Sequence, residues 1–355
     1  MTRDELLRRT QYAEPVLGET FRQVDLHGAD LAGTLFENCE FSGVDLTGAD
    51  LTDSQFVRCR FLESRLHEAR LIGTVFFESE LRGTAMTSAR IENANWYASN
   101  LDHLDLSEAQ IRFAGISRGR LESACFRRAR IEQLVVANVD TLGLDFRDAE
   151  LERSVLLECD LRQADFRTAR CNHLVLTKAN LAGQSFEGQT LAYTQFTECD
   201  LTNSDFSQAH LVQGNFTAAR LQNARFRSTD APQAIFLNAQ LEGADFTEAN
   251  LGGAIYQGAK APRARFQRAH LYQANFQAAD LSEANLSSAD LTYADLSHAN
   301  LEQADLRGTT LLRAQLHQVR DRATQFTDRS RAIGDDPERL ASDRWRPQPA
   351  PRARP

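Results

Sequence analysis

The sequence predicts an all-β solenoid along most of its 355 residues, and three regularities support this prediction. A sizeable apolar residue or a cysteine, here called a centre, stands at every fifth position from Phe21 to Leu316, with three exceptions among 60 positions. A compact residue such as Ala29 or Cys39 stands two positions before the centres. Of the 19 glycines, 14 stand two positions after a centre. Together these regularities indicate one five-residue unit repeated without insertion.

A period of five residues fits neither regular element, because a helix repeats near 3.6 residues and a strand at 2. A short extended stretch followed by a tight turn does fit, and stacked units of this kind build a solenoid. The centre and the residue two before it then face inward, and the residue between them faces outward. Glycine suits the turn because it adopts positive φ readily. Pro232 and Pro262 each follow a centre directly, where a turn accepts proline.

The unit Ala-(Asp/Asn)-Leu-x-x, clearest in Ala289-Asp290-Leu291 and Ala299-Asn300-Leu301, resembles the motif of the pentapeptide-repeat family. The resemblance covers about residues 16–316 and implies a right-handed, quadrilateral parallel β-helix with four units per coil. Sixty units then make about 15 coils, a rod roughly 70 Å long at about 4.8 Å per coil. The family is defined by architecture, and most of its members have no assigned activity. Its interior is filled by side chains and leaves no room for a ligand.

Residues 1–15 are expected to form a helical cap over the first coil. Thr2 and Glu5 have the spacing of a capping box, and Leu6 and Leu7 follow inside the helix. Open ends of a solenoid expose strand edges, so a cover is expected there. A short helix with a leucine pair is similar to one that precedes the first unit in family members associated with type VI secretion. This resemblance implies an accessory role in bacterial type VI secretion.

Residues 317–355 are expected to form a C-terminal cap and a tail rich in proline and arginine. Asp336 and Pro337 predict a helix start, since proline suits the first helical turn. This helix carries Leu340 and Trp345 and is expected to fold over the last coil. The segment Pro347–Pro355 is expected to be extended or disordered.

Composition limits the classes of function. No apolar stretch is long enough for a membrane span, and Met1 is followed by charged residues rather than by a signal peptide. We therefore expect a cytoplasmic protein, with delivery by a specialised secretion system left open, and the family resemblance implies a bacterial one. The net charge of −9 makes direct nucleic-acid binding unfavourable.

No catalytic motif, phosphate loop or zinc spacing occurs in the sequence. All eight histidines fall at outward positions and are expected to be solvated. We expect no enzyme activity, cofactor, metal or small-molecule substrate. Cys39, Cys59, Cys159 and Cys199 share one inner column and are expected to be reduced and buried, although Cys39 and Cys59 would lie one coil apart, at a spacing that permits a disulfide.

One wall of the rod differs from the other three. Directly before the centre it repeatedly carries a large apolar residue, whereas the same position on the other walls offers only Ala85 and Cys125. Contiguous exposed apolar area marks an interface, so this wall is the candidate surface for a partner protein or a homodimer. The candidate interface consists of Leu35, Val57, Val75, Phe77, Tyr97, Val135, Val155, Leu157, Val175, Ile235, Leu237 and Ile255.

An alternative function comes from aspartates that recur on another wall. Family members resembling DNA rods bind DNA gyrase and other type II topoisomerases, and an acidic ladder would imitate nucleic-acid phosphates. Arg65, Arg225 and Arg265 interrupt this column, which favours an ordinary mixed-charge surface. We therefore predict an interaction scaffold or adaptor first and a DNA mimic second. The candidate ladder is Asp25, Asp45, Asp105, Asp145, Asp165, Asp205, Asp245 and Asp305.

Overall fold

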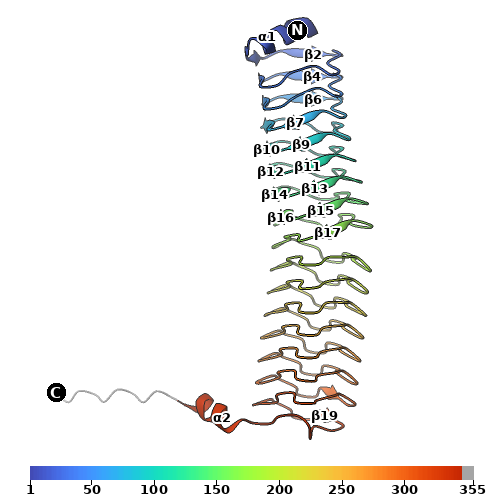
Figure 1. The fold of residues 1–355 in the computed structure, drawn as a ribbon, viewed down its shortest axis with the longest axis vertical. Helices are drawn as coiled ribbons and strands as arrows, with labels where there is room; N and C mark the ends of the chain where they lie inside the picture. Colours follow the sequence, from blue (N-terminus) through green and yellow to red (C-terminus); the bar gives the residue numbers. More distant parts are fainter. Residues whose placement is uncertain (346–355) are drawn as a thin grey trace, which may run out of the picture.

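The computed structural model describes residues 1–345, except for the side chain of Arg344, and it forms a rod of stacked coils with the N-terminus at one end (Figure 1). The segment Pro347–Pro355, for which the sequence predicted an extended or disordered chain, lies outside the described residues. None of the described helices is long and apolar enough to cross a membrane.

The regular strands are short and lie in the N-terminal half of the rod, apart from one pair near the C-terminal end. The largest sheet contains eight strands, namely β1 (Val16–Leu17), β3 (Leu35–Glu37), β5 (Gln55–Val57), β8 (Val75–Phe77), β10 (Asn95–Tyr97), β12 (Gly115–Ser117), β14 (Val135–Ala137) and β16 (Val155–Leu157). A second sheet contains β7 (Arg70–Ile72), β9 (Arg90–Glu92), β11 (Gln110–Arg112), β13 (Arg130–Glu132), β15 (Glu150–Glu152) and β17 (Arg170–Asn172). The remaining strands are β2 (Thr20–Arg22), β4 (Glu40–Ser42) and β6 (Arg60–Leu62) in one sheet, and β18 (Asp305–Leu306) with β19 (Gln325–Phe326) in another.

Parallel pairing between residues 20 apart runs along the whole rod. Leu35 pairs with Gln55 in the first coils, and Asp290 bridges to Thr310 in the last ones. A coil therefore contains four five-residue units, which confirms the predicted quadrilateral parallel β-helix. The winding continues past Leu316, because β19 pairs with β18 in the same 20-residue register.

The turn within each unit uses a left-handed backbone conformation two positions after the centre. All 14 glycines with positive φ occupy this position, for example Gly33 at 68°. Other residue types adopt the same conformation, as Asn38 does at 54° and Arg58 at 52°. Glycine marks the turn in the sequence because it adopts this conformation without steric cost, but other residue types at this position of the coil adopt it too.

The core is a column of stacked, mostly apolar side chains. Phe36 and Phe56 are fully buried one coil apart, with ring centroids 4.9 Å apart and planes within 2° of parallel. Phe41 on the adjoining wall meets Phe36 edge to face at 71°. Farther along, aromatic rings on two opposite walls meet in the same way, as Phe216 and Phe226 do at 87°. Burying each such ring contributes about 1.5–3 kcal/mol to the stability of the fold, and this contribution is repeated along the rod.

Helix α1 (Arg3–Gln11) begins at the predicted N-cap, where the Thr2 hydroxyl accepts a hydrogen bond from Glu5 N at 3.4 Å. Leu6 is completely buried and belongs to the core cluster of the rod. Helix α2 (Pro337–Arg344) also begins as predicted, with the Asp336 carboxylate accepting hydrogen bonds from two backbone N–H groups of the first turn. It lies beside the last coils rather than across the open end (Figure 1).

Candidate functional site

The candidate interface lies on the wall formed by the eight-stranded sheet and by its continuation toward the C-terminus. We call this surface the apolar wall. Its outward side chains stand directly before and after the centres, so residues 20 apart stack along the rod. Val57, Phe77 and Tyr97, for example, are consecutive partners in register. The wall is therefore a set of side-chain columns held in place by backbone pairing.

The first patch of the apolar wall contains Val57, Val75, Phe77 and Tyr97, all of them half-buried. The rings of Phe77 and Tyr97 stack at 5.4 Å, and the guanidinium of Arg118 lies 5.5 Å from the centre of the Tyr97 ring. Leu35 lies apart from this patch, because Gln55 stands between it and Val75.

The second patch contains Val135, Val155, Leu157 and Val175, of which Val135 is the most accessible at 44% exposure. Val155 is the strand partner of Val135 and also bridges to Val175, so these three valines form one column. Leu157 pairs with Ala137 in the neighbouring column.

A shallow hollow of about 340 Å³ lies on the N-terminal side of this second patch. Gly115, Ser117 and Ala137 form its floor, because their side chains are too small to fill the wall. Phe113, 50% exposed, and Val135 stand among its lining residues.

The third patch contains Ile235, Leu237 and Ile255, again half-buried. Ile235 and Ile255 bridge directly, and they line a hollow of about 460 Å³ beside Tyr193. Glutamines surround this hollow, and Gln213 donates a hydrogen bond to Gln233 at 2.8 Å. This patch therefore has an apolar centre and a polar margin.

The eight aspartates of the candidate ladder lie on the opposite wall, and their carboxylates have local partners. Oδ1 of each accepts a hydrogen bond from the backbone N–H two residues later, as Asp45 does from Thr47 at 3.0 Å. Among the described residues, all of them except Asp105 also pair with an arginine within 4.0 Å. The hydrogen bond from the turn backbone to the carboxylate thus explains why aspartate recurs in this column. The paired arginines offset most of the negative charge of these carboxylates.

Asp245 keeps its place in the ladder column, between Arg225 and Arg265, but it is only 2% exposed. Arg265 and Arg227 cover its carboxylate at 2.9 and 3.4 Å. Burial raises the pKa of this carboxyl, but the hydrogen bonds from Thr247 and the two guanidinium groups together lower it below its usual value. A carboxylate held in this way is a structural part of the wall and is hidden from a partner.

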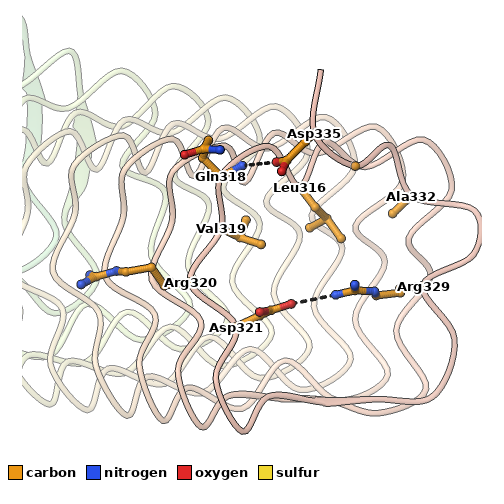
Figure 2. Close-up of a pocket in the computed structure, with 9 residues that line it drawn as sticks. Leu316, Gln318, Val319, Arg320, Asp321, Arg329, Ala332 and Asp335 are labelled. Carbon is orange, nitrogen blue, oxygen red and sulfur yellow. Dashed lines mark hydrogen bonds and ion pairs between the residues drawn. The ribbon is translucent and has the colours of Figure 1, made fainter. Parts of the chain in front are cut away.

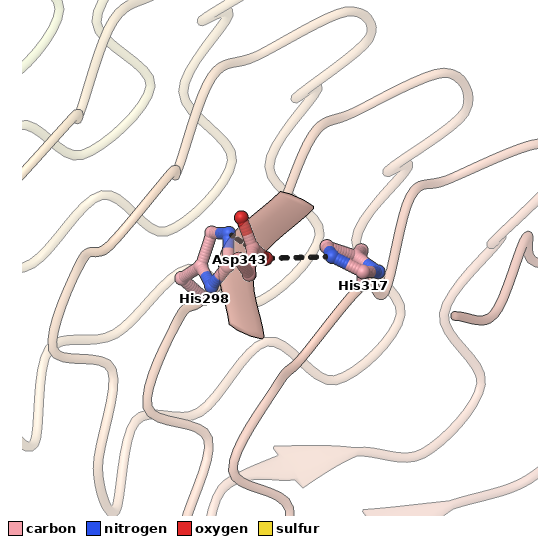
Figure 3. A group of neighbouring side chains, drawn as sticks. All are labelled: His298, His317 and Asp343. Atoms are coloured by element: carbon pink, nitrogen blue, oxygen red, sulfur yellow. Dashed lines mark hydrogen bonds and ion pairs between the residues drawn. The ribbon is translucent and has the colours of Figure 1, made fainter. Parts of the chain in front are cut away.

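The expectation that every histidine is solvated is wrong for His317, whose side chain is 3% exposed. It does face outward from the rod, but helix α2 covers it. Asp343 of α2 lies 3.1 Å from His317 Nε2 and 3.6 Å from His298 Nε2 (Figure 3). The repeat alone does not reveal this cluster, because Asp343 comes from a helix outside the repeat. These residues are candidates for holding a metal ion.

A larger hollow, of about 550 Å³, lies at the C-terminal end of the rod (Figure 2). Its lining is mostly polar, with an ion pair of 2.7 Å between Arg329 and Asp321. The Asp335 carboxylate accepts a hydrogen bond from Gln318 N at 2.9 Å. Val319 and Ala332 pack against the core cluster. The hollow therefore lies at the end of the rod, where the chain covers the core with an incomplete coil.

All six cysteines are free thiols, and five of them are buried. The hydrogen bond from the Cys59 side chain lowers the pKa of Cys39 to about 7, and the same contact raises the pKa of Cys59. Cys39 and Cys59 are both buried in adjacent coils, where they pack as small apolar side chains.

Comparison with known proteins agrees with this architecture. The family model for pentapeptide repeats matches in 8 copies, over residues 20–56, 145–183, 185–217, 219–255, 257–287 and 284–320. No curated protein matches the chain.

Similar solved structures include a trypsin-treated form of QnrB1, a plasmid-mediated fluoroquinolone resistance protein, with 19% identity over 54% of this chain and 88% of that one and a TM-score of 0.31. Another is HetL, a pentapeptide repeat protein involved in heterocyst differentiation regulation in the cyanobacterium Nostoc, with 24% identity over 72% of this chain and 92% of that one and a TM-score of 0.20. Likeness at this level concerns the fold alone. The repeated family match covers more than half of the sequence, and this chain belongs to the pentapeptide repeat family.

Proposed function

We propose that this protein is a non-enzymatic scaffold that binds a partner protein, or a second copy of itself, through the apolar wall. The observation that carries the proposal is the asymmetry between walls. All four walls are built from the same five-residue unit, yet the large apolar residues directly before the centres gather on one of them. The repeat does not need them for folding, because the centres already fill the core. An interface explains why they concentrate on one wall.

The surroundings of the first patch fit an interface with an apolar centre and a charged margin. Phe77 and Tyr97 supply aromatic area, which dominates binding energy at many interfaces. Arg118 stands against Tyr97, and an ion pair between Arg58 and Glu37 lies beside Val57. Charges at such a margin orient a partner more than they add affinity.

The experiment places charge on the apolar wall and compares it with the same change elsewhere. In the double variant Phe77→Glu with Val155→Glu, two carboxylates would have to be buried in the interface. We expect loss of the dimer mass in light scattering, or loss of partner capture from native lysate. Leu62→Glu with Ile72→Glu is the matched control, since both residues are half-buried on other walls. A double variant that keeps both the wild-type mass and the wild-type binding would exclude the proposal.

The second candidate is a DNA mimic that binds DNA gyrase through the aspartate ladder. Its support is the regular carboxylate column, but the arginines paired along that column reduce the negative potential that a phosphate mimic needs. A supercoiling assay with purified gyrase separates the two candidates. Inhibition or protection of gyrase would favour the mimic, and an inert protein would favour the scaffold.

The proposal extends to a bacterial, cytoplasmic setting and to an accessory role in type VI secretion. Its support is helix α1 with Leu6 and Leu7, of which Leu6 packs into the first coil. Co-purification with secretion-apparatus components, compared between the wild type and a Leu7→Glu variant, would test this extension.

A further inference from the structure

Helix α2 meets the apolar wall at a cluster of two histidines and one carboxylate. His298 and His317 come from adjacent coils, where His298 N donates a backbone hydrogen bond to His317 O at 2.8 Å. Asp343 comes from the last turn of α2. The Nε2 atoms of both histidines point at the same oxygen, Oδ2 of Asp343, from 3.6 and 3.1 Å (Figure 3). Three potential ligand atoms therefore converge on one point between the rod and the helix.

From this convergence we infer that His298, His317 and Asp343 bind a zinc ion that fastens α2 to the apolar wall. Two imidazoles and one carboxylate suit zinc, whereas magnesium and calcium prefer oxygen ligands throughout. The ligand atoms lie within 4.8 Å of one another. Bonds of about 2.0–2.2 Å to zinc need shorter separations, which small side-chain rotations supply. His298 and Asp343 are free to rotate, since their side chains are 48% and 40% exposed.

The buried ligand, His317, already has neighbours that orient its ring. Its Nδ1 accepts a hydrogen bond from Asp336 N at 3.2 Å and lies 3.6 Å from Oδ1 of Asp335. Zinc at Nε2 requires the ring proton at Nδ1, where the Asp335 carboxylate is the acceptor. A carboxylate behind a ligating histidine is the usual support for such a site. Metal binding would therefore exchange the contact with Asp336 N for one with Asp335.

The ion would add to the contacts by which α2 meets the last coils. Besides the histidine pair, Arg339 donates a hydrogen bond to Gln315 at 2.9 Å, and Leu340 is half-buried. A helix of eight residues is too short to be stable without such anchoring. Three protein ligands leave the fourth zinc position to water. Zinc would thus hold α2 over the C-terminal end of the apolar wall, whatever the partner of that wall is.

The test uses the full-length protein without a polyhistidine tag, titrated with zinc chloride by calorimetry in a buffer that does not chelate. We expect one zinc per chain, and binding at least about 10-fold weaker in both His298→Ala and Asp343→Asn. His210→Ala is the matched control, because His210 also faces a carboxylate, Asp230 at 3.6 Å, but lies outside the cluster. The control should bind zinc as the wild type does, and magnesium chloride should give no binding.

Hydrogen exchange provides a second measurement that reports on α2 itself. Zinc should increase the protection of the α2 amides in the wild type and in His210→Ala, but not in Asp343→Asn. The absence of stoichiometric binding to the wild type would overturn the inference, and so would equal binding in all variants. Weakening in His298→Ala without any effect of Asp343→Asn would mean that the rod holds the ion alone, which would also overturn it.

Discussion

The rings of Phe77 and Tyr97 stack on the outside of the rod, with centroids 5.4 Å apart and planes 6° from parallel. One position earlier in the same two strands, Phe76 and Trp96 stack on the inside, 5.8 Å apart and within 2° of parallel. Successive residues of β8 and β10 thus build two aromatic stacks, one on each face of the wall. The inner stack belongs to the core, and the outer stack is accessible to a partner.

This arrangement predicts that truncating Phe76 and truncating Phe77 lower the free energy of unfolding by different amounts. Phe76→Ala should lower the free energy of unfolding by about 3–5 kcal/mol, because it leaves a cavity between Phe56 and Trp96. Phe77→Ala should cost about 1 kcal/mol, mainly from the lost contact with Tyr97. Urea unfolding of both variants measures the difference. Similar losses in the two variants would contradict the assignment of inner and outer faces.

Asp245 should contribute more to stability than an exposed member of the same ladder. Its carboxylate accepts hydrogen bonds from Thr247 N at 3.0 Å and from the Thr247 hydroxyl at 2.6 Å, beneath two arginines. Asp245→Ala removes these charge-assisted bonds and should lower the free energy of unfolding by about 1.5–3 kcal/mol. Asp25→Ala is the control, since its side chain is 77% exposed, and it should cost about 0.5 kcal/mol. Equal effects would show that burial adds nothing at Asp245.

Asp45 should make the rod sensitive to acid. Hydrogen bonds from Thr47, through its side chain and its backbone N–H, and then from Arg65, hold the pKa of Asp45 at about 2, below its ordinary value of 3.8. Because the folded pKa is the lower one, this stabilisation is fully present above pH 4 and is lost as the pH falls toward 2. Asp45→Asn should therefore be less stable than the wild type at pH 7 and lose less stability between pH 4 and pH 2. Unfolding in urea at these pH values checks this, and parallel losses in both proteins would contradict it.

The sequence was sufficient to predict the coil because its five-residue period assigns each side chain to a wall and a face. Phe77 and Tyr97, 20 residues apart, can be placed side by side from the period alone. The burial of Asp245 was not predictable in this way. It depends on the side-chain conformations of Arg227 and Arg265, and periodicity does not specify them.

The cluster of His298, His317 and Asp343 shows more clearly what the five-residue period cannot predict. His298 and His317 could have been placed in adjacent coils by counting, because they are 19 residues apart and the coil contains 20. Asp343 lies beyond the last unit, where no period fixes the path of the chain. Its position depends on how α2 docks, which is set by tertiary contacts such as that between Arg339 and Gln315.

Tyr256 provides the last prediction, because its hydroxyl is buried without a hydrogen-bond partner among the described residues. The side chain is fully buried in a column of phenylalanines, 4.8 Å from the Phe236 ring and 4.6 Å from the Phe276 ring. Burial raises the pKa of this phenol, so the group stays neutral, but its hydroxyl has still lost the hydrogen bonds that water provides. Leaving such a group unsatisfied costs about 1–3 kcal/mol.

Tyr256→Phe removes this cost and keeps both ring stacks, since the neighbours in the column are already phenylalanines. The variant should therefore be more stable than the wild type, by about 1 kcal/mol in urea unfolding. Tyr193→Phe is the matched control, because Tyr193 is 41% exposed and water can satisfy its hydroxyl, so its stability should not change. A Tyr256→Phe variant that is less stable than the wild type would mean that the hydroxyl has a partner in solution, most simply a water molecule enclosed between the coils.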